Sequence, residues 1–422
     1  MNRDHLVNNY INNLGQRLLS ATPHAPHTFT FFVIDNPQIN AFATFGGYIG
    51  IYSGLIRAAT TESELGSVIA HEIAHVTQDH LRRSIEKSSN MEVPTTVALL
   101  AAILLGGDAP ELAEATIATV IAGQQQQQLS FSRDHEREAD RLGIERLSSA
   151  NFNPEAMAHF FNLIREKSRY GTAYPEYLLT HPVTTERISE ALDRARQLPK
   201  IKNERDVEFL AIQARLTLSH TKDSGQLIKR LSSKKDIKSR YTTILALLEN
   251  RQHREALEII KILLAKFPNV LSFQMTEAKI YQAMKSWKLA ENSYLAILNI
   301  SPYNRLVTRA LADHYLLRND YKNGAEILLR LSQHSPLKAS ELRLLATIAN
   351  AQGNKAEMYL NQGEAFILEG RYSQALKVLL LAQKTAAGSF YLTNRIDARI
   401  DEIRSKSGLK KQQKNKQTNR SY

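Results

Sequence analysis

The chain has 422 residues, 43% of them hydrophobic and 23% charged, a composition that excludes a wholly disordered or collagen-like protein. The absence of cysteine excludes disulfides, a thiol nucleophile and any cysteine-ligated metal. The formal charge of +12 is uneven: residues 1–200 carry 17 Lys and Arg against 22 Asp and Glu, whereas residues 201–422 carry 37 against 20. Length and this difference predict two domains.

The first half of the chain begins with a helical apolar stripe over residues 5–19, interrupted by Asn and Gln. This stripe lacks the continuous apolar run of a secretory signal. Residues 29–34 are apolar and rich in β-favouring residues, which predicts a buried strand. Two strand-like pieces then flank Gly46 and Gly47, and this pattern predicts a hairpin.

Three helices are predicted next. Thr61 and Glu64 have the spacing of a capping box, and an apolar helix is expected from there to residue 76. Two more strong helices are predicted over residues 132–148 and 154–167.

Residues 84–130 predict two weak helices around Gly106 and Gly107. Their longest apolar run, 97–105, is too short to span a bilayer, and no other run in the chain reaches 18 residues. A lid over a cleft, contact with a membrane surface and packing in the core are all compatible with this run.

The second half predicts only paired amphipathic helices. Prolines recur at an interval of 34 residues, as do small residues, at Pro268, Pro302, Pro336, Ala278, Ala312 and Ala346. This period is typical of tetratricopeptide repeats, in which small residues allow two helices to cross closely. The alternative is an irregular helical bundle.

The motif that indicates chemistry is His71-Glu72-x-x-His75 on the helix predicted after Thr61. A spacing of four residues places both imidazoles on one helical face, where they can share a zinc ion. Glu72 can then take a proton from metal-bound water. Because this helix is otherwise apolar, burying these polar groups without a metal would be costly.

Catalytic zinc requires a third protein ligand. The metzincin pattern is excluded, because Leu81 and Gln78 occupy the positions where it needs His and Gly. His80 is one residue away from that position, and we interpret it as a solvated residue at the helix end.

Glu136 is the better third ligand. On its predicted helix it shares a face with Asp140, which can accept the free N–H of a zinc-bound imidazole. Glu138 points elsewhere and is predicted to be a solvated charge. The alternative is that all three belong to a surface charge cluster.

These motifs, together with Asn40 ahead of the Gly pair, resemble those of the M48 zinc metallopeptidases. The resemblance extends over nearly all of residues 1–390. It implies one Zn²⁺ per chain, bound by His71, His75 and Glu136. It also implies that Glu72 is the general base and that Asp140 orients a ligand.

By the same resemblance, the strand that begins at Gly46, Gly47, Tyr48 and Ile49 lines the cleft and pairs with extended substrate. One position departs from the family pattern, since relatives often have proline where this chain has Phe45. The departure concerns the conformation of the loop and leaves the chemistry unaffected.

His181, between Thr180 and Pro182, matches a histidine that lies near the metal in relatives. Three roles remain open for it. It can stabilise the oxyanion of the tetrahedral intermediate, occupy the open position on zinc and hold the enzyme inactive, or be a loop residue before a capped helix.

The expected fold is an α+β zincin-like metallopeptidase domain, mostly helical with a small sheet, followed by an all-α tetratricopeptide-repeat solenoid. The expected boundaries are 1–198 for the peptidase, 199–403 for the repeats and 404–422 for a basic, disordered tail.

With its repeat domain, the chain resembles a periplasmic subgroup of the M48 family. This implies a quality-control endopeptidase with chaperone-like activity, acting on misfolded or stalled outer-membrane β-barrel proteins and contacting the barrel-assembly machinery through its repeats. Periplasmic location follows from the resemblance alone, and the missing signal is then expected to precede this chain.

Two alternatives stay open. A repeat scaffold whose zinc site is capped or inactive is one. The other is a nucleic-acid binder that uses the basic tail, which is the weaker alternative because no aromatic platform or recognised nucleic-acid fold accompanies the charge.

Overall fold

The computed structural model describes residues 1–21, 28–87, 132–170, 174–201, 206–386 and 389–418. The predicted helices within 84–130, apart from the start of that segment, and the apolar run 97–105 lie outside the described residues. The chain divides into two compact units, and the division falls after Ser286.

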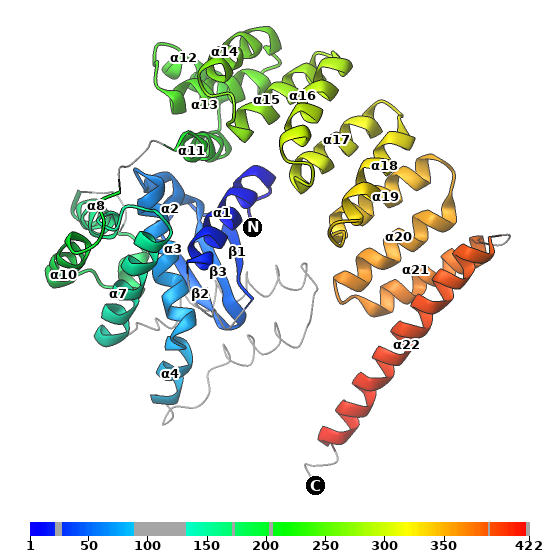
Figure 1. Cartoon of the computed structure of the whole chain (residues 1–422), viewed down its shortest axis with the longest axis horizontal. Coiled ribbons are helices and arrows are strands. Elements are labelled where there is room, and N and C mark those ends of the chain that lie inside the picture. The colour runs from blue at the N-terminus through cyan, green and yellow to red at the C-terminus, as the bar shows by residue number, and fades with distance from the viewer. Residues whose placement is uncertain (22–27, 88–131, 171–173, 202–205, 387–388, 419–422) are drawn as a thin grey trace. The chain divides into compact units, whose positions relative to one another are not determined.

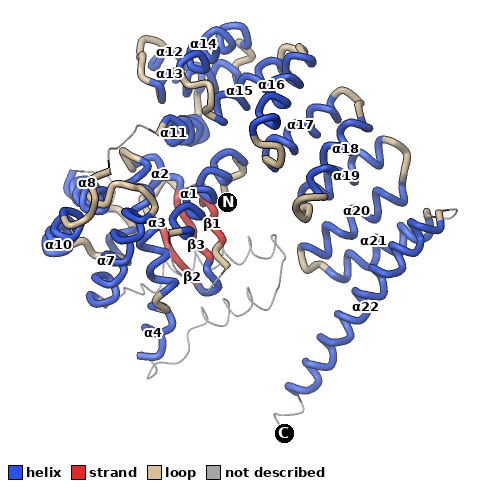
Figure 2. The backbone as a smooth tube through the Cα atoms, in the orientation of Figure 1, coloured by secondary structure: helices blue, strands red, loops and turns tan. Residues whose placement is uncertain are grey.

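The first unit contains a three-stranded sheet in the order β1-β3-β2, drawn in red in Figure 2. Its strands are β1 (Thr30–Ile34), β2 (Ala41–Thr44) and β3 (Tyr48–Tyr52). β3 lies in the centre, parallel to β1 and antiparallel to β2. The predicted strand and hairpin are therefore both present. Gly46 and Gly47 each have a φ of 78°, a left-handed conformation that glycine adopts without strain.

Helices surround this sheet (Figure 1), with α1 packed on β1 and α3 packed on β2 and β3. Those of the peptidase region are α1 (His5–Ser20), α2 (Ser53–Ala58), α3 (Glu62–Thr77), α4 (His80–Lys87), α7 (Arg133–Ser149), α8 (Ala156–Tyr170), α9 (Tyr177–Thr180) and α10 (Thr185–Arg196), with a short 3₁₀ turn η1 (Phe45–Gly47). The helices predicted after Thr61, Ser132 and Pro154 correspond to α3, α7 and α8.

The first unit extends beyond the predicted boundary at residues 198 and 199. It also includes α11 (Val207–Ser219), α12 (Ser224–Leu231), α13 (Ile237–Glu249), α14 (His253–Lys266) and α15 (Leu271–Ala283). The buried side-chain amide of Gln213 on α11 donates to the carbonyl oxygens of Ile56 and Ala59 at 2.8 and 2.7 Å. Arg215 pairs with Asp4 at 2.6 Å. These contacts join the first repeat helices to the peptidase.

The second unit is helical throughout its described residues. It consists of α16 (Trp287–Ile300), α17 (Arg305–Leu317), α18 (Tyr321–Ser332), α19 (Ala339–Ala351), α20 (Lys355–Leu368), α21 (Tyr372–Thr385) and α22 (Phe390–Thr418). Residues 404–418, predicted to be a disordered tail, continue α22. Among the described residues, none of the helices has both the length and the apolar character needed to cross a membrane.

The predicted 34-residue period is visible in the helices. α14, α16, α18 and α20 begin at residues 253, 287, 321 and 355, each 34 residues after the last. The turn before each of these helices contains a left-handed residue with the same period: Arg251, Lys285, Asn319 and Gly353. Because Arg and Lys adopt this conformation only at a cost, tertiary packing and not local preference fixes the turn. The helical repeat architecture is therefore confirmed.

Candidate active site

α3 carries two of the candidate ligands, and its start is strongly capped. Thr61 Oγ1 accepts from the backbone N–H of Glu64 at 3.1 Å, and the Glu64 carboxylate accepts from the backbone N–H of Thr60 at 2.6 Å. The four-residue spacing then places His71 and His75 on the same face, with ring centroids 4.6 Å apart. Both rings are buried.

α7 carries the third candidate and packs directly on α3. Gly143 makes this close approach possible, since a Cβ there would lie 3.3 Å from the backbone nitrogen of His71. Arg146 fixes the same crossing by donating to the Ala70 carbonyl at 2.9 Å. Glu136, in the first turn of α7, is thereby directed at the two histidines.

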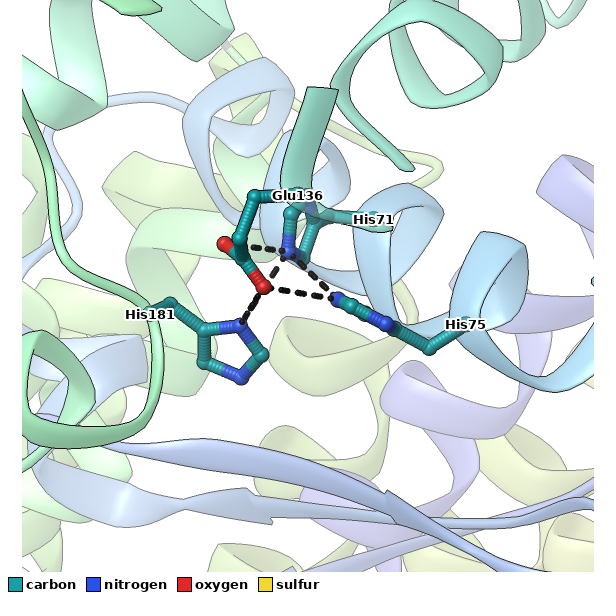
Figure 3. Close-up of side chains that lie close together, drawn as sticks. All are labelled: His71, His75, Glu136 and His181. Carbon is teal, nitrogen blue, oxygen red and sulfur yellow. Dashed lines mark hydrogen bonds and ion pairs between the residues drawn. The ribbon is translucent and has the colours of Figure 1, made fainter. Parts of the chain in front are cut away.

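Four side chains converge in this place: His71, His75, Glu136 and His181 (Figure 3). One donor atom from each lies within 4.8 Å of all the others. The Nε2 atoms of His71 and His75 are 2.9 Å apart, and Glu136 Oε1 lies 3.4 Å from His75 Nε2. Residues far apart in the sequence thus form one buried cluster of metal-binding atoms.

His181 enters the cluster from the end of α9. Its backbone N–H donates to the Tyr177 carbonyl at 2.8 Å, and its ring stacks on the Tyr177 ring at 4.7 Å. Nδ1 lies 2.9 Å from Glu136 Oε1, whereas Nε2 lies 3.5 Å from Glu72 Oε1. His181 therefore touches both a candidate ligand and the candidate base, unlike an ordinary loop residue.

Glu72 is fully buried beside the cluster, and neither of its carboxylate oxygens has a hydrogen-bond partner among the described residues. Burial raises the pKa of Glu72, although the charges of His181 and His71 and the backbone N–H of Ala43 oppose this. A buried carboxylate without a hydrogen bond requires a further partner, and a metal-bound water would supply one. Two imidazoles and a carboxylate next to it are also a suitable donor set for a metal.

The charge states of the cluster suit metal binding. Burial lowers the pKa of His75 well below its usual value, so the imidazole stays neutral. Burial alone would raise the pKa of Glu136, but the charge and hydrogen bond of His181 outweigh it and hold this pKa well below its usual range. A neutral imidazole and an ionised carboxylate are the forms that bind a metal.

Asp140 lies behind His71, with Oδ1 2.9 Å from His71 Nδ1. Arg187, on α10, holds this carboxylate with two hydrogen bonds of 2.7 and 2.8 Å. Another nitrogen of the same guanidinium lies 2.7 Å from Glu136 Oε2. Burial would raise the pKa of Asp140, but the charge of Arg187 and the contact with His71 lower it.

Arg187 was missed by the sequence analysis. It lies just after the cap of α10, among surface-type charges, and no spacing relates it to the motifs on α3 and α7. Only the packing of α10 against α7 directs it into the site.

Two interpretations made from the sequence are wrong. His80 is fully buried, not solvated, and its ring lies against His75 with the two Nδ1 atoms 2.9 Å apart. Glu138 is only partly exposed, and its Oε2 lies 2.9 Å from His80 Nε2 and 3.0 Å from Arg83 Nη1. His80 directly follows Asp79, whose φ of 53° is left-handed and breaks the chain between α3 and α4.

The expected substrate strand also needs correction. Tyr48 and Ile49 belong to β3, which pairs with β1 on one side and β2 on the other and so has no free edge for a peptide. Gly47 is buried, and a Cβ there would lie 2.5 Å from the Thr28 carbonyl oxygen. Of the four residues expected to bind substrate, Gly46 lines a cleft beside the site.

β1 and β2 are the two edge strands of the sheet. The outer edge of β1 is engaged by hydrogen bonds with Asn2, Asn8 and Asn12. The backbone N–H of Tyr52 donates to the Asn40 carbonyl, so by alternation Phe42 faces β3 and the N–H and C=O of Ala43 point outward. The cleft beside it is lined by Ala43 to Gly46, by His75 and by neighbouring residues at the start of α4. The edge available to a peptide is therefore that of β2.

Comparisons with known proteins give the family of the chain. A family model described as peptidase family M48 matches residues 5–195. The chain is 33% identical over 408 residues to a putative beta-barrel assembly-enhancing protease of Vibrio cholerae, covering 95% of this chain and 84% of that protein. It is 32% identical over 415 residues to the beta-barrel assembly-enhancing protease of Escherichia coli K12, with the same coverage. A solved tetratricopeptide repeat protein from Parabacteroides merdae is 15% identical with a TM-score of 0.30, covering 56% of this chain and 97% of that one.

The fold and the buried donor cluster define a metallopeptidase with an HExxH helix and a glutamate on a second helix. The chain belongs, within peptidase family M48, to the family of the beta-barrel assembly-enhancing proteases. The resemblance inferred from the sequence is confirmed.

Proposed function

We propose that the chain is a zinc-dependent endopeptidase in which His71, His75 and Glu136 hold one Zn²⁺. The observation that carries this proposal is the buried convergence of these donors next to Glu72, a carboxylate without a hydrogen bond. Two imidazoles and one carboxylate are a common protein set for catalytic zinc, which keeps a further position for water or substrate.

When bound, zinc lowers the pKa of its water to about 7 and polarises a carbonyl oxygen. Glu72 lies where it can accept a proton from the attacking water and pass it to the leaving amine. Its raised pKa assists the first step, because a weaker acid has a stronger conjugate base. Asp140 and Arg187 hold His71 in place and contribute no proton.

His181 Nδ1 lies among the donor atoms, which supports the role of occupying the open position in the resting enzyme. Substrate then has to displace it. Once displaced, the imidazole remains beside Glu72 and can donate to the oxyanion, so these two roles follow each other within one cycle.

The substrate strand adds to the free edge of β2, with Ala43 supplying the outward N–H and C=O groups. The backbone N–H of Ala43 also acts on the Glu72 carboxylate, so this edge lies next to the proposed base. This replaces the expectation that the peptide pairs with β3.

The biological role follows from the relatives. Their name, beta-barrel assembly-enhancing protease, supports a role in quality control of outer-membrane β-barrel proteins in the periplasm. Misfolded or stalled barrel proteins are the substrates, and assistance to their assembly is a chaperone-like activity. The helix pairs with their 34-residue period are tetratricopeptide repeats that contact the barrel-assembly machinery.

Two measurements test this proposal. Metal analysis of the purified chain should give one zinc per chain, lost when His71→Ala removes a ligand. Cleavage of a permanently unfolded test protein, such as reduced and carboxymethylated lactalbumin, should be abolished by Glu72→Gln while zinc is retained. A protein that holds zinc and supports barrel assembly equally well with Glu72→Gln would instead be a scaffold with a capped site.

A further inference from the structure

His80 has no place in the chemistry described so far, although its ring is fully buried beside the donor cluster. It is the first residue of α4, directly after Asp79, which has a left-handed backbone conformation. A non-glycine residue in this conformation is uncommon and costs free energy. With Asp79 in this conformation, the ring of His80 packs against the ring of His75.

A continuous chain of contacts leads from His75 to a carboxylate through His80. His75 Nδ1 lies 2.9 Å from His80 Nδ1, and His80 Nε2 lies 2.9 Å from Glu138 Oε2. Arg83 Nη1, one turn further along α4, lies 3.0 Å from the same carboxylate oxygen. All three distances are those of hydrogen bonds.

The protons of this chain follow from the role of His75. Its Nε2 faces the donor cluster, and a nitrogen that binds a metal cannot also carry a proton, so the proton is on Nδ1. That N–H donates to His80 Nδ1, which leaves the His80 proton on Nε2, where it donates to Glu138. Each donor thus meets an acceptor, with a negative charge at the end.

The two histidines of the HExxH helix are therefore supported differently. His71 Nδ1 lies directly against a carboxylate, 2.9 Å from Asp140 Oδ1. His75 reaches its carboxylate only through a second imidazole. His80 also stacks on His135 with centroids 4.4 Å apart and planes 8° from parallel, and His135 precedes the ligand Glu136. The same ring thus contacts one proposed ligand and the neighbour of another.

We propose that His80 and Glu138 are positioning residues of the metal site, in which Glu138 acts through His80 to hold His75 in its metal-binding tautomer and orientation. This inference rests on the proposed zinc ligands and extends them to a carboxylate–imidazole–imidazole relay. Removing the hydrogen-bond partner of a metal ligand typically lowers the metal affinity by about 10- to 100-fold.

The test is the zinc affinity of the full chain, measured by competition with a chromophoric chelator. His80→Met fills the space without hydrogen bonds and should weaken zinc binding by about 10- to 100-fold. His80→Gln retains an acceptor and a donor and should recover most of this loss. Glu138→Gln should produce a smaller loss, since its amide oxygen still accepts from His80.

Two matched controls accompany these variants. Glu145→Gln removes the charge of an exposed carboxylate on the same helix as Glu138, and His159→Ala removes an exposed histidine on α8. Both should bind zinc like the unmodified chain. Circular dichroism of the zinc-free variants checks that each is folded.

The double variant His80→Met with Glu138→Gln identifies the route. If Glu138 acts through His80, the double variant binds zinc no more weakly than His80→Met alone. Equal zinc affinity of folded His80→Met and the unmodified chain would overturn the inference, as would a Glu138→Gln loss that persists undiminished beside His80→Met. Should the unmodified chain bind no zinc, the proposed ligand set itself fails.

Discussion

Arg187 and Asp140 form a buried two-point ion pair, with Nε 2.7 Å from Oδ2 and Nη2 2.8 Å from Oδ1. The same guanidinium also lies over the Phe161 ring, 4.8 Å from its centroid. A cation from α10 thus bridges two buried carboxylates of α7, Asp140 and Glu136. Through this contact α10, which carries none of the HExxH or Glu136 ligands, helps to hold the metal site in place.

Arg187→Met should therefore destabilise the chain by about 3–5 kcal/mol, because it removes the guanidinium that pairs with two buried carboxylates. Urea unfolding of the zinc-free protein measures this free energy. Arg137→Met is the matched control, since Arg137 pairs with Glu186 at an exposed position and its loss should cost less than about 1 kcal/mol. Equal losses from both variants would contradict the role assigned to Arg187.

His181→Ala should increase cleavage of an unfolded test protein, because it opens the position that His181 Nδ1 occupies among the donor atoms. Zinc should remain bound by the other three ligands. Initial rates at saturating zinc, with His159→Ala as the exposed-histidine control, measure the effect. A fall of about 10²- to 10³-fold at full zinc content would show instead that the oxyanion contact dominates.

Ala43→Pro should reduce kcat/KM for an unfolded test protein by at least about tenfold while zinc content is unchanged. Proline removes the outward N–H of β2, one of the groups to which an added strand would bond, and edge strands tolerate it. Phe42→Pro, which removes an N–H facing β3, should instead lower the thermal midpoint. Unchanged kinetics of a folded Ala43→Pro variant would show that peptide does not bind along this edge.

Glu62 should make stability depend on pH. Burial and the nearby Asp206 raise its pKa to about 7, against contacts from Arg17 at 3.1 Å and Tyr10 at 2.8 Å. Because the folded chain holds this proton more tightly than the unfolded chain, the contribution is complete below about pH 4.5 and is lost as pH rises through about 7.

The loss amounts to up to about 3 kcal/mol between these limits. Unfolding free energies of the unmodified chain and Glu62→Gln, measured from pH 5 to 8, should show that the variant has the flatter profile. Glu145→Gln, an exposed carboxylate, should follow the unmodified chain. Parallel profiles for Glu62→Gln and the unmodified chain would contradict the assignment.

The successful predictions depended on the spacing of residues that are close together in the sequence. The cap at Thr61 and the four-residue interval between His71 and His75 depend only on helix geometry, so α3 and its facing imidazoles could be predicted from the sequence. The Gly pair and its flanking strands were predictable for the same reason. The 34-residue period similarly predicted paired helices that recur at this interval.

Long-range packing decided what the sequence could not predict. Nothing near Tyr48 indicates that its strand becomes the centre of the sheet and not the edge. His80 faces inward directly after Asp79, which takes a left-handed conformation that its residue type does not require. Arg187 reaches Asp140 across 47 positions of sequence, a separation without any periodic signal.

The free edge of β2 has a consequence for which proteins the enzyme cuts. A strand can add to this edge only after leaving its own sheet, because its backbone N–H and C=O groups must be unpaired. A barrel protein that closes rapidly withdraws its strands, whereas one that stalls keeps them available. If the proposed substrates bind along this edge, selection is kinetic: the lifetime of an open strand, more than the residues it contains, determines whether a protein is cleaved.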